Sequence, residues 1–163
     1  MIQKLLPSIK EKWPREDSKN SIFIQQDNAR THVPCDDEEF CRAATQDGFG
    51  IRLMYQPPNS PDINVLDLGF FSAIQSLHYK KCLKTTDELV SSVMRLYEDF
   101  SVVKSNRIFL TLQLSMVDTM ILKGSNNYKI EHLNKEMLER QGRLPSVIRC
   151  DPLLIQQIIN HCS

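Results

Sequence analysis

The stretch that decides the fold is Ile22-Phe23-Ile24-Gln25-Gln26-Asp27-Asn28. Three apolar residues followed by four polar ones predict a buried strand that ends in a polar turn. Asp27 therefore falls where the strand ends. In α/β sheets, ligands gather outside the carboxyl ends of the strands, so this carboxylate is a candidate site residue.

The residues around this strand complete a βαβ unit. Residues 2–12 predict a short amphipathic helix, and the acids at residues 36–39 predict the first turn of a second helix, which Gly48 ends. Residues 51–55 alternate as a second strand, which Pro57-Pro58 ends. A strand, a helix and a strand in this order predict two parallel strands joined by a right-handed crossover.

The second half of the sequence has mainly helical patterns. Thr85 and Glu88 have the spacing of a capping box, and an apolar stripe follows them at Leu89, Val93, Leu96 and Phe100. A longer helix is expected over residues 104–122, although the alternation within residues 108–114 also fits a strand. The tail contains a short apolar helix over residues 153–159. The predicted fold class is α/β, with a short parallel sheet and a mainly helical C-terminal half.

Charge and apolar content limit the function classes. The net charge is +0, from 20 basic and 20 acidic residues, which gives no support to autonomous DNA binding. The nearest basic patch, interpreted as a solvated helix end, is His78, Lys80, Lys81 and Lys84. No apolar run approaches the roughly 18 residues of a membrane span, so we expect a soluble, intracellular protein without a membrane partner.

The cysteines do not form a metal-binding pattern. There are five of them, an odd number, and none is spaced as Cys-x-x-Cys. The histidines do not complete a zinc pattern either. We therefore expect free, partly buried thiols in a reducing compartment.

Asp67 has two interpretations. An apolar helix face is formed by Ile63, Leu66, Phe70, Ile74 and Leu77. Asp67 falls within this arc, and a carboxylate buried there must be paired, protonated or bound to a cation. Alternatively, Asn64 caps the helix and Asp67 is a first-turn acid that complements the helix terminus. Asp27 likewise has a local alternative, since Asp-Asn pairs are common in simple turns.

Together the two acids suggest a metal site. Asp27 follows one strand, and Asp67 lies near the start of a helix just beyond the neighbouring strand, so both should lie at the same edge of the βαβ layer. Converging carboxylates can hold Mg²⁺ together with water and phosphate oxygens. Two such ions about 4 Å apart would activate an attacking hydroxyl and stabilise the leaving oxygen of a phosphodiester.

Two sequence blocks resemble the catalytic domain of mariner-like transposases. Residues 24–32, Ile-Gln-Gln-Asp-Asn-Ala-Arg-Thr-His, resemble the block around the second metal-binding acid. Residues 56–67, Gln-Pro-Pro-Asn-Ser-Pro-Asp-Ile-Asn-Val-Leu-Asp, resemble the block leading to the third. Between Asp27 and Asp67 lie 39 residues, the spacing typical of plant mariner-like elements. A looser resemblance to the family's C-terminal end covers residues 104–144.

The resemblance implies a truncated RNase H-like fold of the DDE/D superfamily. Residues 1–145 would be a partial catalytic domain, and residues 146–163 an unassigned tail. Asp27 would be the second and Asp67 the third catalytic and metal-binding acid, holding Mg²⁺ or Mn²⁺. The family's reaction is metal-dependent DNA cleavage and strand transfer, so the expected partner is DNA at transposon ends, with a homodimer and a nuclear location also expected.

The sequence also departs from the family pattern. The first acid should lie on a strand well upstream of Ile22. The residues before Ile22 contain Asp17, beside Glu16 and Lys19 in a polar connector, which is no strand position. The family's helix-turn-helix region is likewise not found. The strand at residues 22–24 would then keep one unpaired apolar edge.

Two functions follow as expectations. The first is the C-terminal part of a transposase catalytic domain, inactive as these residues stand because one acid is missing. The alternative is a non-enzymatic transposon remnant or an interaction module for protein or nucleic acid. Asp62 is interpreted as the start of a helix after Ser60-Pro61. Asn28 and His32 are possible orienting residues and are not assigned to the site.

Overall fold

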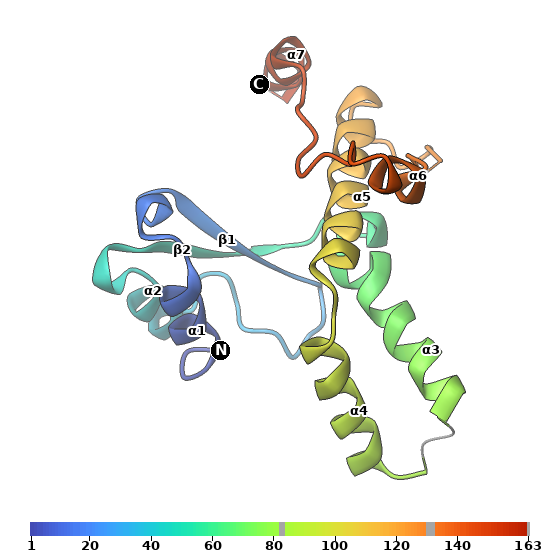
Figure 1. The fold of residues 1–163 in the computed structure, drawn as a ribbon. Coiled ribbons are helices and arrows are strands. Elements are labelled where there is room, and N and C mark those ends of the chain that lie inside the picture. The colour runs from blue at the N-terminus through green and yellow to red at the C-terminus, as the bar shows by residue number, and fades with distance from the viewer. Residues whose placement is uncertain (82–83, 130–132, 163) are drawn as a thin grey trace. The chain divides into compact units, whose positions relative to one another are not determined.

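The computed structural model describes residues 1–81, 84–129 and 133–162, without the side chains of residues 77–81. The chain divides into two compact units, Met1–Asn59 (unit 1) and Ser60–Ser163 (unit 2). The described residues form a mixed α/β fold with seven α-helices and a two-stranded sheet (Figure 1). The predicted class and the helical C-terminal half are thereby confirmed. The division into residues 1–145 and 146–163 stays a prediction.

Unit 1 is built on the predicted βαβ unit. Strands β1 (Ser21–Gln26) and β2 (Gly50–Tyr55) are parallel, in register from Ser21 opposite Gly50 to Gln26 opposite Tyr55. Helix α2 (Glu38–Ala44) lies in the connection, and helix α1 (Leu5–Lys12) precedes β1. The predicted strands, their parallel direction and both helices of unit 1 are confirmed.

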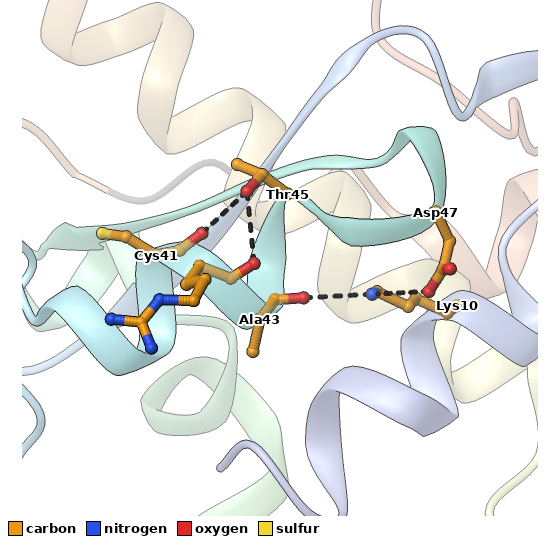
Figure 2. A network of polar contacts seen from close by, with 6 residues as sticks. Lys10, Cys41, Ala43, Thr45 and Asp47 are labelled. Atoms are coloured by element: carbon orange, nitrogen blue, oxygen red, sulfur yellow. Dashed lines mark hydrogen bonds and ion pairs between the residues drawn. The ribbon is translucent and has the colours of Figure 1, made fainter.

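Helix α2 ends earlier than predicted. Asp37 caps its N-terminus, with Oδ1 accepting a hydrogen bond from the Phe40 amide at 2.7 Å. It ends at Ala44 instead of Gly48, because the Thr45 hydroxyl donates to the Cys41 carbonyl at 3.0 Å and a short 3₁₀ turn follows over Gln46–Gly48 (Figure 2). Gly48 completes this turn with a φ of 78°, in the left-handed region that glycine enters freely.

The core of unit 1 lies on one face of the sheet. It consists of Leu6, Ile22, Phe40, Ala44, Phe49, Ile51 and Leu53. Side chains alternate along a strand, so Ile22 points to this covered face and Phe23 to the opposite one. Phe23 is 57% exposed, and the prediction that residues 22–24 are all buried is wrong for it. The reason is that α1 and α2 supply core residues to the covered face only.

Unit 2 consists of helices. A 3₁₀ turn (Pro61–Ile63) and a π-helical turn (Leu66–Phe70) come first. The α-helices are α3 (Phe71–Lys81), α4 (Thr86–Glu98), α5 (Val102–Ile121), α6 (Lys135–Arg140) and α7 (Pro152–Cys162). Helix α5 confirms the predicted long helix, so the alternative of a strand over residues 108–114 is wrong. Helix α7 contains the predicted apolar segment and contacts α5.

Capping defines how α4 and α5 begin. The Thr85 hydroxyl accepts from the Glu88 amide at 3.2 Å while the Glu88 carboxylate accepts from the Thr85 amide at 3.3 Å, which confirms the predicted capping box. Ser101 caps α5 in a similar way, accepting from the Lys104 amide. The predicted apolar stripe of α4 is half-buried, as expected for an inward face.

Gly69 allows α5 to pack closely against the π-helical turn. A Cβ atom at this position would lie 2.5 Å from Ile108 Cδ1. Such a distance is a clash, so only glycine fits here without moving Ile108. The contact holds α5 beside the start of α3.

The structure bears on the expectations about the cysteines, the basic patch and membrane spans. Within the described residues, Cys35, Cys41, Cys150 and Cys162 are free thiols, of which Cys35 and Cys150 are half-buried. Lys84 is exposed, and the rest of the predicted basic patch, His78, Lys80 and Lys81, has side chains outside the described residues. No helix in residues 1–81, 84–129 or 133–162 has the length and apolar content needed to cross a membrane.

Candidate functional site

Asp27 lies directly after β1, at the position that the sequence predicted. Its Oδ1 accepts a hydrogen bond from the Ala29 amide at 2.9 Å, which closes a tight turn around the carboxylate. The His32 Nε2 lies 2.6 Å from the same Oδ1. Both contacts fall on Oδ1, and within the described part of the chain Oδ2 has no recorded partner. The carboxylate is thus held in one orientation with one oxygen available to a ligand.

The surroundings of Asp27 favour its charged form. The backbone hydrogen bond from Ala29 is the main cause that lowers the pKa of Asp27 from its ordinary value of 3.8. Slight burial opposes this effect, and the hydrogen bond and charge of His32 add to it. The side chain is 57% exposed, so an ion from solvent can reach it. Asp27 is therefore an ionised, accessible carboxylate at neutral pH.

The ends of β1 and β2 are joined by hydrogen bonds beyond the last strand residues. The Gln56 amide donates to the Gln26 carbonyl at 2.8 Å, and the Asn28 side-chain amide donates to the Gln56 carbonyl at 3.0 Å. These bonds fasten the turn that carries Asp27 to the end of the neighbouring strand. Asn28 thus has a positioning role in the structure.

Gln26 is a residue of this site that the sequence interpretation missed. It is 8% exposed, and its side-chain amide donates to the Val33 carbonyl at 2.6 Å, across the base of the loop that holds His32. Its Oε1 is buried and has no hydrogen-bond partner among the described residues. The available signal was its position, since an inward-facing place in an alternating strand is unusual for a glutamine.

Asp67 lies in the π-helical turn before α3 and is exposed. The interpretation that Asp67 is buried within an apolar arc is therefore wrong. Leu66, a member of the same predicted arc, is also 38% exposed. The local alternative fits the structure: Asn64 Oδ1 accepts from the Leu66 amide at 3.0 Å, and Asp67 is an acid of the first turn. The π-helical turn moves the side chains off the strict 3.6-residue period on which the arc was drawn.

The other acids near the two blocks have structural positions. Asp62 lies in the 3₁₀ turn Pro61–Ile63, which confirms it as the start of a helical segment. Asp17 lies in the 3₁₀ turn Arg15–Asp17 and accepts a hydrogen bond from the Asn20 side chain at 3.4 Å. Asp17 is thus on no strand, as expected, and does not substitute for a strand-borne acid.

The two candidate acids belong to different units. Asp27 lies in unit 1 and Asp67 in unit 2, and each position is described within its own unit. Within residues 1–81, 84–129 and 133–162, no group of three or more histidine, cysteine, aspartate or glutamate side chains is arranged to hold a metal ion. Asp27 and Asp67 are therefore two separate candidate acids, one in each unit, and both are exposed.

The resemblance of the two sequence blocks to a transposase stays a prediction. The structure shows a parallel βαβ unit with an aspartate at the carboxyl end of its first strand. Comparison of the chain with family models, with curated proteins and with solved structures found no match.

Proposed function

We propose that the chain contributes two metal-binding acids, Asp27 and Asp67, to the RNase H-like catalytic domain of a mariner-like DNA transposase. The observation that carries the proposal is the position of Asp27. It directly follows the first strand of a parallel βαβ unit, inside the block at residues 24–32 that resembles the family. Carboxylates at the carboxyl ends of parallel strands are a common setting for ligand sites.

The chemistry of these residues fits a divalent cation. Mg²⁺ binds through one or two carboxylates and retains water ligands, so it does not need a closed protein cage. Asp27 presents Oδ2 while Oδ1 is held by Ala29 and His32. Asp67 is exposed at the start of a helix. When bound, such an ion would polarise a phosphodiester and lower the pKa of an attacking water.

The protein groups around Asp27 would hold its carboxylate charged and oriented for binding a metal ion. The Ala29 amide keeps the carboxylate ionised, and His32 fixes its rotation. The Asn28 bond to Gln56 ties the turn to the end of β2. The family's reaction uses three acids, so residues 1–163 by themselves are expected to bind a metal ion weakly and not to cleave DNA. A nuclear location and transposon ends as the DNA partner belong to the same proposal.

Metal binding is the test of this site. Mn²⁺ affinity, measured by electron paramagnetic resonance on the full chain, should fall at least tenfold in Asp27→Asn and should also fall in Asp67→Asn. Asp36→Asn is the matched control, because Asp36 is an exposed acid on the same loop as His32 and should leave the affinity unchanged. Equal Mn²⁺ affinity in the wild-type chain and both variants would refute the metal site.

One observation favours the alternative of a non-enzymatic interaction module. Helix α4 exposes Val90, Met94 and Tyr97, spaced by four and three residues on one side of the helix. Such an apolar stripe can dock a partner. Neither function expects residues 1–163 to cleave DNA, so Mn²⁺ affinity separates the two. Cleavage by the chain that requires Mn²⁺ and is lost in Asp67→Asn would, if seen, rule out a purely non-enzymatic role.

A further inference from the structure

Unit 2 contains a cavity that the proposed metal site does not use. It has a volume of about 700 Å³ and lies among the π-helical turn, α3, α4 and the first half of α5. Volumes of this size are typical of sites for small organic molecules. Figure 1 shows these helices in green and yellow.

Small side chains on one wall make the space. Gly69, Ala73 and Ser76 follow one another at spacings of four and three residues and line the same side of the cavity. At Gly69 the wall contacts Ile108 directly, so the helices are close together there. Further along, Ala73 and Ser76 are too short to fill the gap to α4. The cavity therefore follows from residue size within this unit.

The interior of the cavity is apolar. Leu96 and Phe100 of the α4 side and Ile108 of α5 line it, and all three are half-buried. Burying an apolar ligand surface against such side chains is favourable because it removes that surface from water. An aliphatic chain or an aromatic ring fits this lining.

The charged side chains that line the cavity are mostly cations. They are Arg95, Lys104 and Arg107, against the single carboxylate of Asp99. Arg107 is already compensated, because its guanidinium donates to Glu136 and Glu139. Arg95 and Lys104 are exposed and have no ion pair recorded within the described part of the chain. Leaving out Arg107 with its two glutamates, Arg95 and Lys104 give the rim one positive charge more than Asp99 offsets.

We propose that this cavity binds an organic anion that has an apolar body, such as a medium-chain carboxylate or an alkyl phosphate. The apolar part lies against Leu96, Phe100 and Ile108, and the anionic group contacts Arg95 and Lys104. A metal cation does not fit a site with three cationic side chains and one carboxylate. A neutral apolar molecule would leave the charges of Arg95 and Lys104 without a partner. The proposal is independent of the metal site at Asp27.

The first test compares two ligands on the unmodified chain. Octanoate and octanamide have the same chain length and nearly the same shape, and only octanoate is charged. We expect isothermal titration to show octanoate binding at least tenfold more tightly, and amide chemical shifts to change at Ala73, Ser92 and Ile108. Equal affinities, shifts confined to other residues, or no binding of octanoate and octyl phosphate at millimolar concentration would each overturn the proposal. Tighter binding of octyl phosphate than of octanoate would identify the anion as a phosphate monoester.

The second test removes the positive rim. The double variant Arg95→Gln/Lys104→Gln should bind octanoate at least tenfold more weakly and should bind octanamide as the wild type does. The matched control is Arg149→Gln/Lys129→Gln, which removes the same charge from two exposed positions of unit 2 that do not line the cavity. An equal loss of affinity in both double variants would show a general effect of charge and would overturn the assignment to this cavity.

Discussion

Unit 1 and unit 2 bury their apolar residues to different degrees. In residues 1–59, seven hydrophobic side chains form one buried cluster between the sheet and its two helices. In the described part of unit 2, the fully buried side chains are Leu110 and Ser115, with Ser92 close behind. Although unit 2 is the longer of the two, its helices contact one another mainly through half-buried residues.

This difference shows two ways of holding helices in place. In unit 1, side chains from α1, α2, β1 and β2 share one core, so the loss of one member affects all four elements. In unit 2, capping residues and polar contacts between successive helices make up a larger share of the interactions that hold the helices in place. Lys135 Nζ, for example, donates to Thr111 Oγ1 at 2.7 Å and links α6 to α5. We therefore expect core substitutions to have larger effects in unit 1 and local effects to dominate in unit 2.

The largest effect is expected from Phe40→Ala. Phe40 is 1% exposed in the centre of the unit 1 core, and removing a buried phenyl ring costs about 3–5 kcal/mol of stability. Urea denaturation followed by tryptophan fluorescence measures this directly, because Trp13 is the single tryptophan of the chain and lies in unit 1. The midpoint of that transition should fall strongly.

Leu110→Ala provides the comparison in unit 2. Leu110 is 0% exposed in α5. Its truncation should lower the free energy of unfolding of unit 2, followed by circular dichroism, by about 2–5 kcal/mol. The Trp13 transition should stay in place. If Leu110→Ala moved the Trp13 transition as much as Phe40→Ala does, the two units would unfold together and the contrast between them would be wrong. Phe109→Ala is the control, since Phe109 is 44% exposed on the same helix.

A smaller effect is expected from Lys10→Met. Lys10 Nζ donates to the Ala43 carbonyl at 3.0 Å and to Asp47 Oδ2 at 3.1 Å, so it connects α1 to the end of α2 (Figure 2). Hydrogen bonds from charged groups contribute about 1.5–3 kcal/mol, and methionine keeps the apolar stem but removes the donor. The free energy of unfolding measured by Trp13 fluorescence should fall by a comparable amount. Lys12→Met, at an exposed position of α1, should change it little.

Thr85→Ala tests whether local capping matters in unit 2. The substitution removes the acceptor for the Glu88 amide and should destabilise α4 by about 1 kcal/mol. Hydrogen exchange at the amides of residues 87–89 should accelerate, while exchange in α5 stays as in the wild type. Thr86→Ala, one residue later, keeps the cap and should have no such effect. Faster exchange throughout unit 2 would instead show that its helices unfold together.

The smallest effect concerns the pH dependence at Asp27. Because the folded-state pKa is lower than the ordinary 3.8, the contribution of Asp27 to stability is present above pH 3.8 and is lost as the pH falls through the folded pKa. The backbone bond from Ala29 is the largest cause, so His32→Asn should leave the pKa below 3.8. A carboxyl titration followed by nuclear magnetic resonance measures it. A return to the ordinary value in His32→Asn would make His32 the main cause.

Much of the fold follows from local sequence patterns, and the errors have specific causes. Thr85 and Glu88 form a capping box three residues apart, the acids at the start of α2 are adjacent, and each strand has its own short apolar or alternating run. The end of α2 was misplaced because Thr45 satisfies the last carbonyls before Gly48 is reached. The arc around Asp67 was misplaced because a π-helical turn changes the period, and nothing in the residues themselves marks such a turn.

The candidate site was predicted to a similar extent. The sequence places Asp27 at the end of a strand, and the structure confirms this position. It does not reveal that Gln26 spans the loop to Val33 or that Asn28 binds the end of β2, because those partners lie 7 and 28 residues away. Contacts of this kind depend on how the turn is folded and not on spacing.

The sequence by itself determined the order of the elements, the acids that start α2 and the capping box that starts α4. These features depend on periodicity and on local hydrogen bonds, which act over a few residues. The parallel direction of the two strands follows from the order strand, helix, strand along the chain. The tertiary structure alone decided which strand face is covered, so that Ile22 is buried and Phe23 is exposed. It also decided that Lys10 reaches Ala43 across 33 residues. Both outcomes depend on where segments far apart in the sequence pack, and that is a property of the whole unit.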